Sequence, residues 1–170
     1  GKDGGIVDVG GASSEVTVSF GGKTVYSYSL ALGAVRLHDM CGEDASKIRD
    51  CIDTKLREYG DVPRAEMTAI GGTATSLAAL VRGIEPYDPA LVHGTELSAE
   101  EILSWGEKLL GMTQRERLSL RGMDPRRADI LGGGALLLGG ILRHIAAPAV
   151  RVSERDNMEG YLLQMAEGSK

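Results

Sequence analysis

The sequence contains few cysteines, no excess of basic residues and no apolar run of bilayer length. Cys41 and Cys51 have no CxxC spacing, which disfavours a disulfide-stapled secreted scaffold and indicates reduced thiols. The formal net charge of −5 argues against a general nucleic-acid or membrane-surface binder, which would carry a basic excess. The longest weakly polar stretch, Ile130 to Leu142, is shorter than the roughly 20 apolar residues that a bilayer requires. These absences predict a cytoplasmic protein that binds neither nucleic acid nor membrane.

Glycine, by contrast, is abundant. The chain of 170 residues has 24 glycines, which is about twice the average usage, and they follow no fixed period. That pattern excludes collagen and favours loops built from glycine. With 42% hydrophobic and 25% charged residues, the composition is that of a globular domain, and a chain of this length can bury one core. We expect a single domain over residues 1–170. Its abrupt start, without a signal peptide, indicates a segment of a longer polypeptide.

The apolar pattern predicts an α/β domain that begins with three strands. Glu15 to Phe20 alternates, and Gly21-Gly22 after it is a two-residue hairpin signal, with Lys23 to Leu30 as the returning strand. Helical periodicity and short strands follow, with a helical insert over about residues 85–123. The expected strands are Gly5 to Val9, Glu15 to Phe20, Lys23 to Leu30, Glu66 to Ile70 and Ala149 to Val152. The expected helices are Glu43 to Tyr59, Ala74 to Val81, one from its N-cap Ser98 to Leu110, one that begins at Asp124, and Asn157 to Met165. We therefore expect a five-stranded mixed sheet, with three antiparallel strands plus two parallel ones, flanked by helices.

The first turn that could carry chemistry follows the first strand, from Asp8 to Glu15. Its consecutive small residues expose backbone N–H groups toward a common point, which suits a phosphate group, and Ser13 and Ser14 add hydroxyl donors. Asp8 could hold a magnesium ion, directly or through water, and Glu15 could orient or deprotonate an attacking water. The alternative is a glycine-rich hairpin whose polar residues lie in solvent. The flanking Asp8 and Glu15 weaken that alternative.

Gly71, Gly72 and Thr73 form a second turn, between a strand and a helix. This turn places backbone donors at a helix N-terminus, where the macrodipole favours anions. A tight connection that needs glycine only for its backbone angles is an equally supported alternative. The turn is not a P-loop, because the sequence has no GxxxxGK[ST], and the Rossmann spacing GxGxxG is missing as well.

A third feature combines Arg127 and Asp129 with three glycines at 132–134. Each glycine inside a helical pattern costs roughly 1 kcal/mol relative to alanine. Close packing against another backbone, or a bound ligand, would offset that cost. Arg127 and Asp129 are more often surface ion-pair residues than site residues. The histidines share no motif, so the sequence indicates neither a zinc site nor a Ser/His triad.

Together, these turns resemble the exopolyphosphatase/guanosine pentaphosphate phosphatase (Ppx/GppA) family, whose usual form of the first turn is D-[IV]-G-G-[GA]-S-x-E. The segments that carry the resemblance are Val7 to Val16, Ser29 to Leu37, Gly71 to Thr75, Arg127 to Ile130 with Gly133 or Gly134, and Val152 to Arg155 with Glu159-Gly160. They occur in family order and span residues 5 to 163, nearly the whole chain. The resemblance implies the second, C-terminal lobe of a ribonuclease H-like/actin-like ATPase superfold.

The resemblance also implies a function. The family removes terminal phosphate from polyphosphate, or the 5′ γ-phosphate from guanosine pentaphosphate, by water attack assisted by magnesium. Asp8 matches the residue associated with metal binding, and Glu15 matches a catalytic glutamate beside the attacking water. The residues that match the two phosphate-contacting turns are Gly10, Gly11, Ser13 and Ser14 in the first turn and Gly71, Gly72 and Thr73 in the second. This assignment agrees with the chemistry, because phosphoryl transfer needs positioning and charge neutralisation more than covalent catalysis.

Family members begin with a first lobe that carries another phosphate turn and another catalytic glutamate, which this sequence does not contain. We therefore expect a first lobe of the same polypeptide as partner, an active site between the lobes, and weak or no activity from this chain alone. One alternative is a non-catalytic lobe that senses phosphate or nucleotide, in which Glu15 would have no use. Another is a sugar or acetate kinase lobe, which the ending Val152 to Arg155 disfavours. The substrate and the oligomeric state, a homodimer included, remain open.

Overall fold

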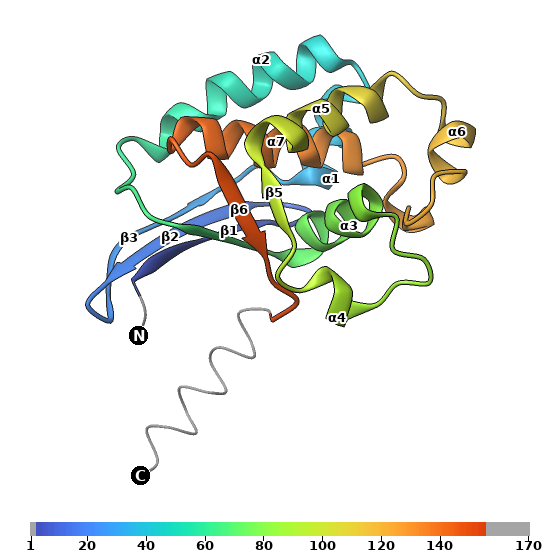
Figure 1. Ribbon diagram of the computed structural model, residues 1–170. Helices are drawn as coiled ribbons and strands as arrows, with labels where there is room; N and C mark the ends of the chain where they lie inside the picture. Colours follow the sequence, from blue (N-terminus) through green and yellow to red (C-terminus); the bar gives the residue numbers. More distant parts are fainter. Residues whose placement is uncertain (1–2, 156–170) are drawn as a thin grey trace.

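The computed structural model describes residues 3–155, which form one mixed sheet and a layer of helices (Figure 1). The strands are β1 (Gly4–Val9), β2 (Ser14–Phe20), β3 (Lys23–Leu30), β4 (Met67–Ile70), β5 (Glu96–Ser98) and β6 (Ala149–Val152). The helices are α1 (Ala34–Cys41), α2 (Ala45–Lys55), α3 (Gly71–Arg82), α4 (Pro89–Val92), α5 (Ala99–Leu110), α6 (Gln114–Leu118) and α7 (Leu131–His144), with short 3₁₀ turns η1 (Leu56–Tyr59) and η2 (Pro125–Arg127). No helix within residues 3–155 has the length and apolar character needed to cross a bilayer.

The sheet has the strand order β3-β2-β1-β4-β6-β5. β1 pairs antiparallel with β2 and parallel with β4, and β4 pairs parallel with β6. The predicted count of five strands is wrong by one, because β5 adds a sixth strand antiparallel to β6. β5 has only three residues and therefore shows no alternation in the sequence. Its central residue, Leu97, is fully buried opposite Val150.

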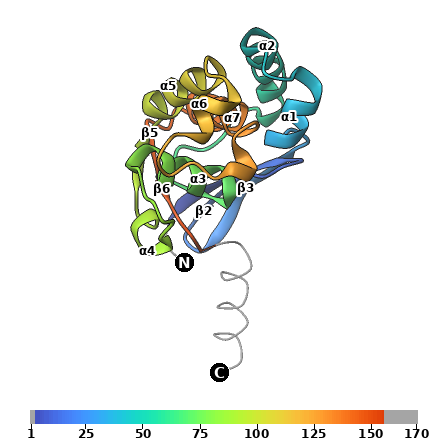
Figure 2. The ribbon, with the colours of Figure 1, turned by 90° about the vertical axis from the view of Figure 1, so that its right-hand side faces the viewer.

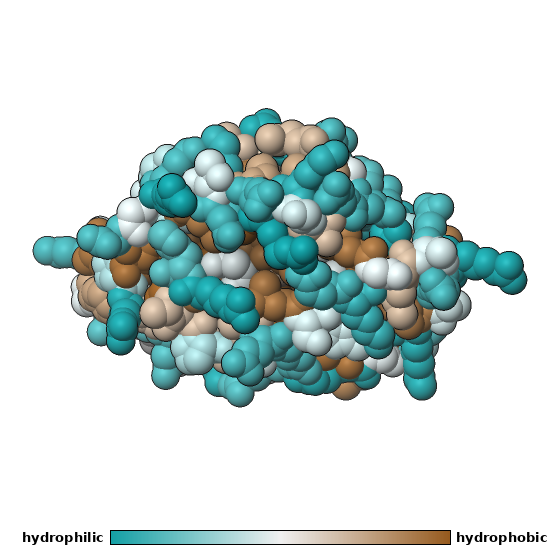
Figure 3. All heavy atoms as spheres, turned by 90° about the horizontal axis from the view of Figure 1, so that it is seen from above, coloured by the Kyte–Doolittle hydropathy of each residue, from teal (hydrophilic) through white to brown (hydrophobic). Residues whose placement is uncertain are grey.

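Helices α1, α2, α5 and α7 lie on one side of the sheet, as both ribbon views show (Figure 1, Figure 2). Figure 3 looks down on this helical layer, where hydrophilic residues cover most of the surface and hydrophobic ones show between them. α7 lies beneath and is buried along most of its length. Its glycines allow close packing: an added Cβ at Gly134 would lie 2.9 Å from Thr73 Cγ2, and one at Gly139 would lie 2.5 Å from Leu103 Cγ. Close packing therefore accounts for glycine at 134 and 139, whereas a Cβ added at Gly133 would lie 3.6 Å from Leu37 Cδ2, an ordinary contact.

Several expected helices are present with altered boundaries. Asp44 caps α2, and the predicted helix Glu43 to Tyr59 divides into α2 and η1. The N-cap Ser98 of α5 is confirmed, since its side chain accepts a hydrogen bond from the Glu101 amide at 3.0 Å. Asp124 caps only the short η2, and α7 begins after it. α1 has no counterpart among the expected helices, and the predicted helix Asn157 to Met165 lies outside the described residues.

Candidate active site

Asp8 and Glu15 are direct partners across the antiparallel pair of β1 and β2. Ser29 of β3 is in turn the partner of Glu15, and its hydroxyl donates a hydrogen bond to Glu15 Oε1 at 2.7 Å. Successive side chains of a strand point to opposite faces, and the neighbours Val7 and Val16 are fully buried under the helices. Asp8, Glu15 and Ser29 therefore form a row on the sheet face turned away from α7. Register across the strands, rather than a motif, reveals Ser29 as part of this row.

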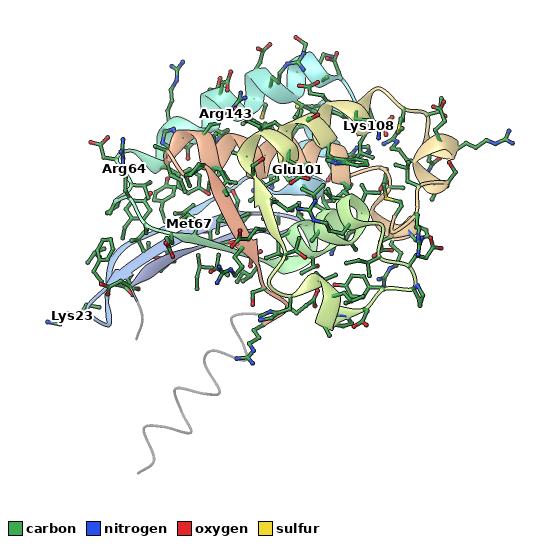
Figure 4. All side chains as sticks on the ribbon, in the orientation of Figure 1. Lys23, Arg64, Met67, Glu101, Lys108 and Arg143 are labelled. Carbon is green, nitrogen blue, oxygen red and sulfur yellow. The ribbon has the colours of Figure 1, made fainter. Side chains whose placement is uncertain are left out.

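The first glycine turn is held against the start of α1. The Gly10 amide donates to the Ser13 carbonyl at 3.0 Å, which closes the turn. The Gly10 carbonyl accepts from the Ala34 amide, and the Gly11 carbonyl from the Val35 amide, both at 2.9 Å. These contacts use the first free amides of α1 and fix the turn on that helix. They place it at the end of the strands away from Lys23, which marks the β2–β3 turn in Figure 4.

Ser14 has an interior position that the sequence does not reveal. Its side chain is fully buried, and its hydroxyl lies 3.0 Å from the Tyr59 hydroxyl. Tyr59 itself donates to the Ser14 carbonyl at 2.9 Å. The Ser14 hydroxyl is therefore engaged on the core side of the turn, and the hydroxyl donor that remains at the turn for a phosphate is Ser13.

Replacing Tyr59 with phenylalanine should lower the free energy of unfolding by about 1–3 kcal/mol, because it leaves two buried polar groups of Ser14 without this partner. Burial also raises the pKa of the Tyr59 phenol, so the folded state favours the neutral phenol. The stability from this preference is present below the unfolded pKa of about 10 and is lost as pH rises above it. Urea denaturation at neutral and alkaline pH measures both effects.

The matched control is Tyr28→Phe, which removes the hydroxyl of a partly exposed tyrosine. The centroid of the Tyr28 ring lies 5.6 Å from the centroid of the Tyr59 ring. Its loss of stability should be small. Equal losses for Tyr59→Phe and Tyr28→Phe would contradict a structural role for the buried hydroxyl.

The second glycine turn meets Asp8. Ile70 of β4 pairs with Asp8 in the parallel register, and α3 begins at the next residue without a side-chain cap. Gly71 has φ +81, and a Cβ added there would lie 2.2 Å from Asp8 Oδ1. Only glycine avoids this collision at such a backbone angle. The predicted metal residue, Asp8, and the predicted second phosphate turn are thus in contact. The Thr73 side chain is buried, so within this turn Thr73 can offer a phosphate only its backbone.

Arg127 lies over the same turn. A Cβ added at Gly72 would lie 1.9 Å from the Arg127 guanidinium, so the cation rests directly on the glycine backbone. Asp129, two residues later, is exposed. Beside Gly72 and Arg127 lies a cavity of about 450 Å³, whose lining includes Tyr87. The structure therefore places a cation and a cavity at the N-terminus of α3, where anions are favoured.

Tyr87, in the lining of this cavity, also contacts Glu154. The Tyr87 hydroxyl donates a hydrogen bond to Oε1 of Glu154, a residue that follows β6 in the chain. Burial, together with this hydrogen bond, raises the pKa of Tyr87 to about 12. The phenol is therefore a neutral donor at physiological pH, and the contact joins two segments far apart in the chain.

The carboxylates fit magnesium in one particular way. Within residues 3–155 there is no group of three or more His, Cys, Asp or Glu side chains that could enclose a metal ion. Mg²⁺, however, usually keeps several waters and is held by one or two carboxylates together with substrate phosphates. Asp8, next to Gly71 and across from Glu15, fits that mode of binding, in which phosphate completes the site.

Comparison with known proteins gives a consistent result. The model of the Ppx/GppA phosphatase family matches residues 2–168. Exopolyphosphatase 2 of Mycobacterium tuberculosis is 30% identical over 95% of this chain and 55% of its own length. A bifunctional 3-dehydroquinate synthase/phosphatase of Fusobacterium nucleatum is 29% identical over 95% of this chain and 26% of its own length. The chain thus spans about half the length of the first of these curated relatives and about a quarter of the second.

Solved structures agree on the fold. The Ppx/GppA family member of Aquifex aeolicus superposes with a TM-score of 0.88 and 27% identity, over 99% of this chain and 58% of the other. An exopolyphosphatase-like protein gives a TM-score of 0.86 at 25% identity, over 98% of this chain and 60% of the other. The predicted α/β lobe of the actin-like type is confirmed, with six strands in the described part in place of five.

Proposed function

The chain belongs to the Ppx/GppA phosphatase family, and we propose that it is one lobe of a phosphohydrolase that removes terminal phosphate from a phosphoanhydride chain by water attack. One observation carries this proposal: Asp8 contacts Gly71 of the second turn and is paired with Glu15 across the strands. These contacts support a site in which a phosphate-binding turn, a metal-binding carboxylate and a carboxylate for water lie together. Phosphoryl transfer needs this combination.

Each residue has a distinct part in the proposed reaction. The turn that the Gly10 amide closes holds the substrate phosphates through the Gly11 amide and the Ser13 hydroxyl. The first amides of α3 hold them as well, and Arg127 neutralises their charge. Asp8 holds magnesium, directly or through water, and the bound ion supplies further neutralisation of phosphate charge.

Glu15, fixed by the hydrogen bond from Ser29, orients the attacking water and accepts its proton. The water oxygen then forms a bond to the terminal phosphorus as the bridging P–O bond breaks, and the shortened phosphate chain leaves with the bridging oxygen. Orientation of water by a carboxylate is an established contribution in such reactions.

We further propose that the first lobe of the same polypeptide supplies the other half of the site, in keeping with the 55% coverage of the mycobacterial relative. This chain alone would then be weakly active or inactive. The test compares phosphate release from long-chain polyphosphate and guanosine pentaphosphate, with and without magnesium, by this chain and by the polypeptide extended upstream in its gene. Magnesium-dependent release by the extended protein alone is the expected result. Binding without release by either would favour a sensing lobe, and phosphate transfer from ATP to an acceptor would favour a kinase.

The cavity beside Gly72 favours a nucleoside polyphosphate as the substrate of this site. Polyphosphate has no apolar part, whereas the cavity is lined by apolar groups next to the phosphate turn, namely Ala79, Ile84, Met123 and Pro125. Tyr87 and Arg127 add an aromatic ring and a cation to its lining. A purine nucleoside in this cavity would place its phosphates at the N-terminus of α3.

Replacing Tyr87 with alanine should weaken the binding of guanosine pentaphosphate about tenfold, as expected for loss of an aromatic contact to a base. The binding of tripolyphosphate should not change, because it makes no such contact. Tyr87→Phe is the control: it keeps the ring and removes the hydroxyl that pairs with Glu154. Isothermal titration of both ligands measures the difference. Equal changes for the two ligands would contradict a nucleoside in this cavity.

A further inference from the structure

Arg117 of α6 is the largest fully buried side chain among the described residues, with 1% of its surface exposed. Its guanidinium forms an ion pair with Glu43, which lies between α1 and α2. It also donates from Nη1 to the Ala128 carbonyl at 2.8 Å. Its Nε has no hydrogen-bond partner in the part of the chain that the structure describes. A full positive charge is thus held in the protein interior by an ion pair to one segment and a hydrogen bond to another.

Stability alone does not account for this arrangement. Burying a charge is costly, and apolar replacement of buried ion pairs is often neutral or stabilising. The incompletely satisfied guanidinium of Arg117 increases that cost. An apolar side chain could fill the same space, but it could not join Glu43 to the Ala128 carbonyl. The contacts themselves are therefore the property that distinguishes Arg117 from an apolar residue.

The Ala128 carbonyl leads directly to the phosphate turn. Ala128 follows Arg127, whose guanidinium rests on the backbone of Gly72. The Arg127 amide donates to the Asp124 carbonyl at 2.9 Å, so this residue is part of the short turn η2. The preceding loop also contacts α3: a Cβ added at Gly122 would lie 2.4 Å from the Ala79 carbonyl oxygen. The main chain is therefore held by hydrogen bonds at Arg127 and at Ala128, so the contact made by Arg117 constrains the point from which the Arg127 side chain leaves the backbone.

We propose that Arg117 and Glu43 are positioning residues that hold Arg127 over the first turn of α3 through the Ala128 carbonyl. This inference rests on the proposed function, in which Arg127 binds substrate phosphate. Neither positioning residue touches the substrate. Glu43 orients the guanidinium of Arg117, Arg117 fixes the Ala128 carbonyl, and Arg127 follows.

The test is a double-mutant cycle in which the affinity for tripolyphosphate is measured for each variant. The NMR chemical shifts of the Gly72 and Thr73 amides monitor the titration, because they report even weak binding by this chain. Glu43→Gln keeps the shape of a partly exposed side chain and removes its charge. It should weaken tripolyphosphate binding about threefold to tenfold, within the range of couplings between contacting residues. In an Arg127→Ala background, the same change should have no further effect. Arg117→Lys keeps the charge without the planar fork and should match Glu43→Gln.

Glu101→Gln is the matched control. Glu101, labelled on α5 in Figure 4, is also partly exposed and pairs with Arg82 at 3.0 Å. Either substitution makes the chain less negative, so general electrostatics would strengthen anion binding. Weaker binding in Glu43→Gln alone therefore points to position and not to net charge.

Three results would overturn the inference or its premise. If Arg127→Ala leaves tripolyphosphate affinity unchanged, the assignment of Arg127 in the proposed function fails. If Arg127→Ala weakens binding but Glu43→Gln behaves like Glu101→Gln, the positioning role alone fails. If Glu43→Gln weakens binding equally with and without Arg127, the pair acts on general structure and not through Arg127. Thermal unfolding of each variant confirms that binding is measured on folded protein.

Discussion

Replacing Glu15 with glutamine should reduce phosphate release by the upstream-extended polypeptide by about 10²–10⁴-fold, the usual contribution of a general base. Glutamine has the size of glutamate and keeps an oxygen toward Ser29, whose hydroxyl donates to Glu15 Oε1 at 2.7 Å in the unmodified protein. Folding and substrate binding should therefore change little, whereas proton acceptance from water is lost. Steady-state phosphate release with magnesium and saturating substrate separates the rate from the affinity.

Two controls make this result specific. Ser29→Ala leaves the carboxylate in place and removes only its orienting bond, so its loss of rate should be smaller than that of Glu15→Gln. Glu58→Gln removes an equal charge from a partly exposed carboxylate that pairs with Lys55, and it should not alter the rate. A Glu15→Gln protein that hydrolyses at the normal rate would remove Glu15 from the mechanism and favour a sensing lobe.

Local sequence signals were sufficient to predict much of the fold. A β-branched run predicted β1, alternating residues predicted β2, and the Gly21-Gly22 hairpin signal predicted β3. The short turn between β1 and β2 fixes their register, which makes Asp8 and Glu15 opposite partners. Ser98 was predicted as an N-cap from residues within one helical turn. Such features depend on neighbours in the chain, so a pattern within a few residues contains the needed information.

Contacts between distant segments could not be predicted in this way. The burial of Ser14 depends on Tyr59, which is 45 residues away. Glu154 meets Tyr87 across 67 residues. An arginine on a short polar helix, such as Arg117, is expected at the surface. Only the contacts with Glu43 and Ala128, from other parts of the chain, make it a buried cation. These positions are set by how helices pack on the sheet, which a local pattern does not specify.

Replacing Gly71 with alanine should weaken magnesium-dependent binding of tripolyphosphate more than tenfold, a loss of at least about 1.4 kcal/mol. The new Cβ would lie 2.2 Å from Asp8 Oδ1, so the carboxylate must move away from the phosphate turn. The substitution also places a side chain at φ +81, where a residue other than glycine costs roughly 1–2 kcal/mol of stability. Binding and stability therefore both decrease, for separate reasons.

Gly42→Ala distinguishes the two effects. Gly42 has φ +60, and an added Cβ there would meet nothing within 4 Å. It should lose a similar amount of stability in urea denaturation and bind tripolyphosphate with magnesium as the unmodified chain does. If Gly71→Ala also binds normally, the carboxylate of Asp8 can leave its place against Gly71 without consequence, and Asp8 is not the residue that holds the metal. If only Gly71→Ala loses binding, the contact between Asp8 and the glycine turn is a requirement of the site, and this explains why α3, directly after β4, begins with a residue that has no side chain.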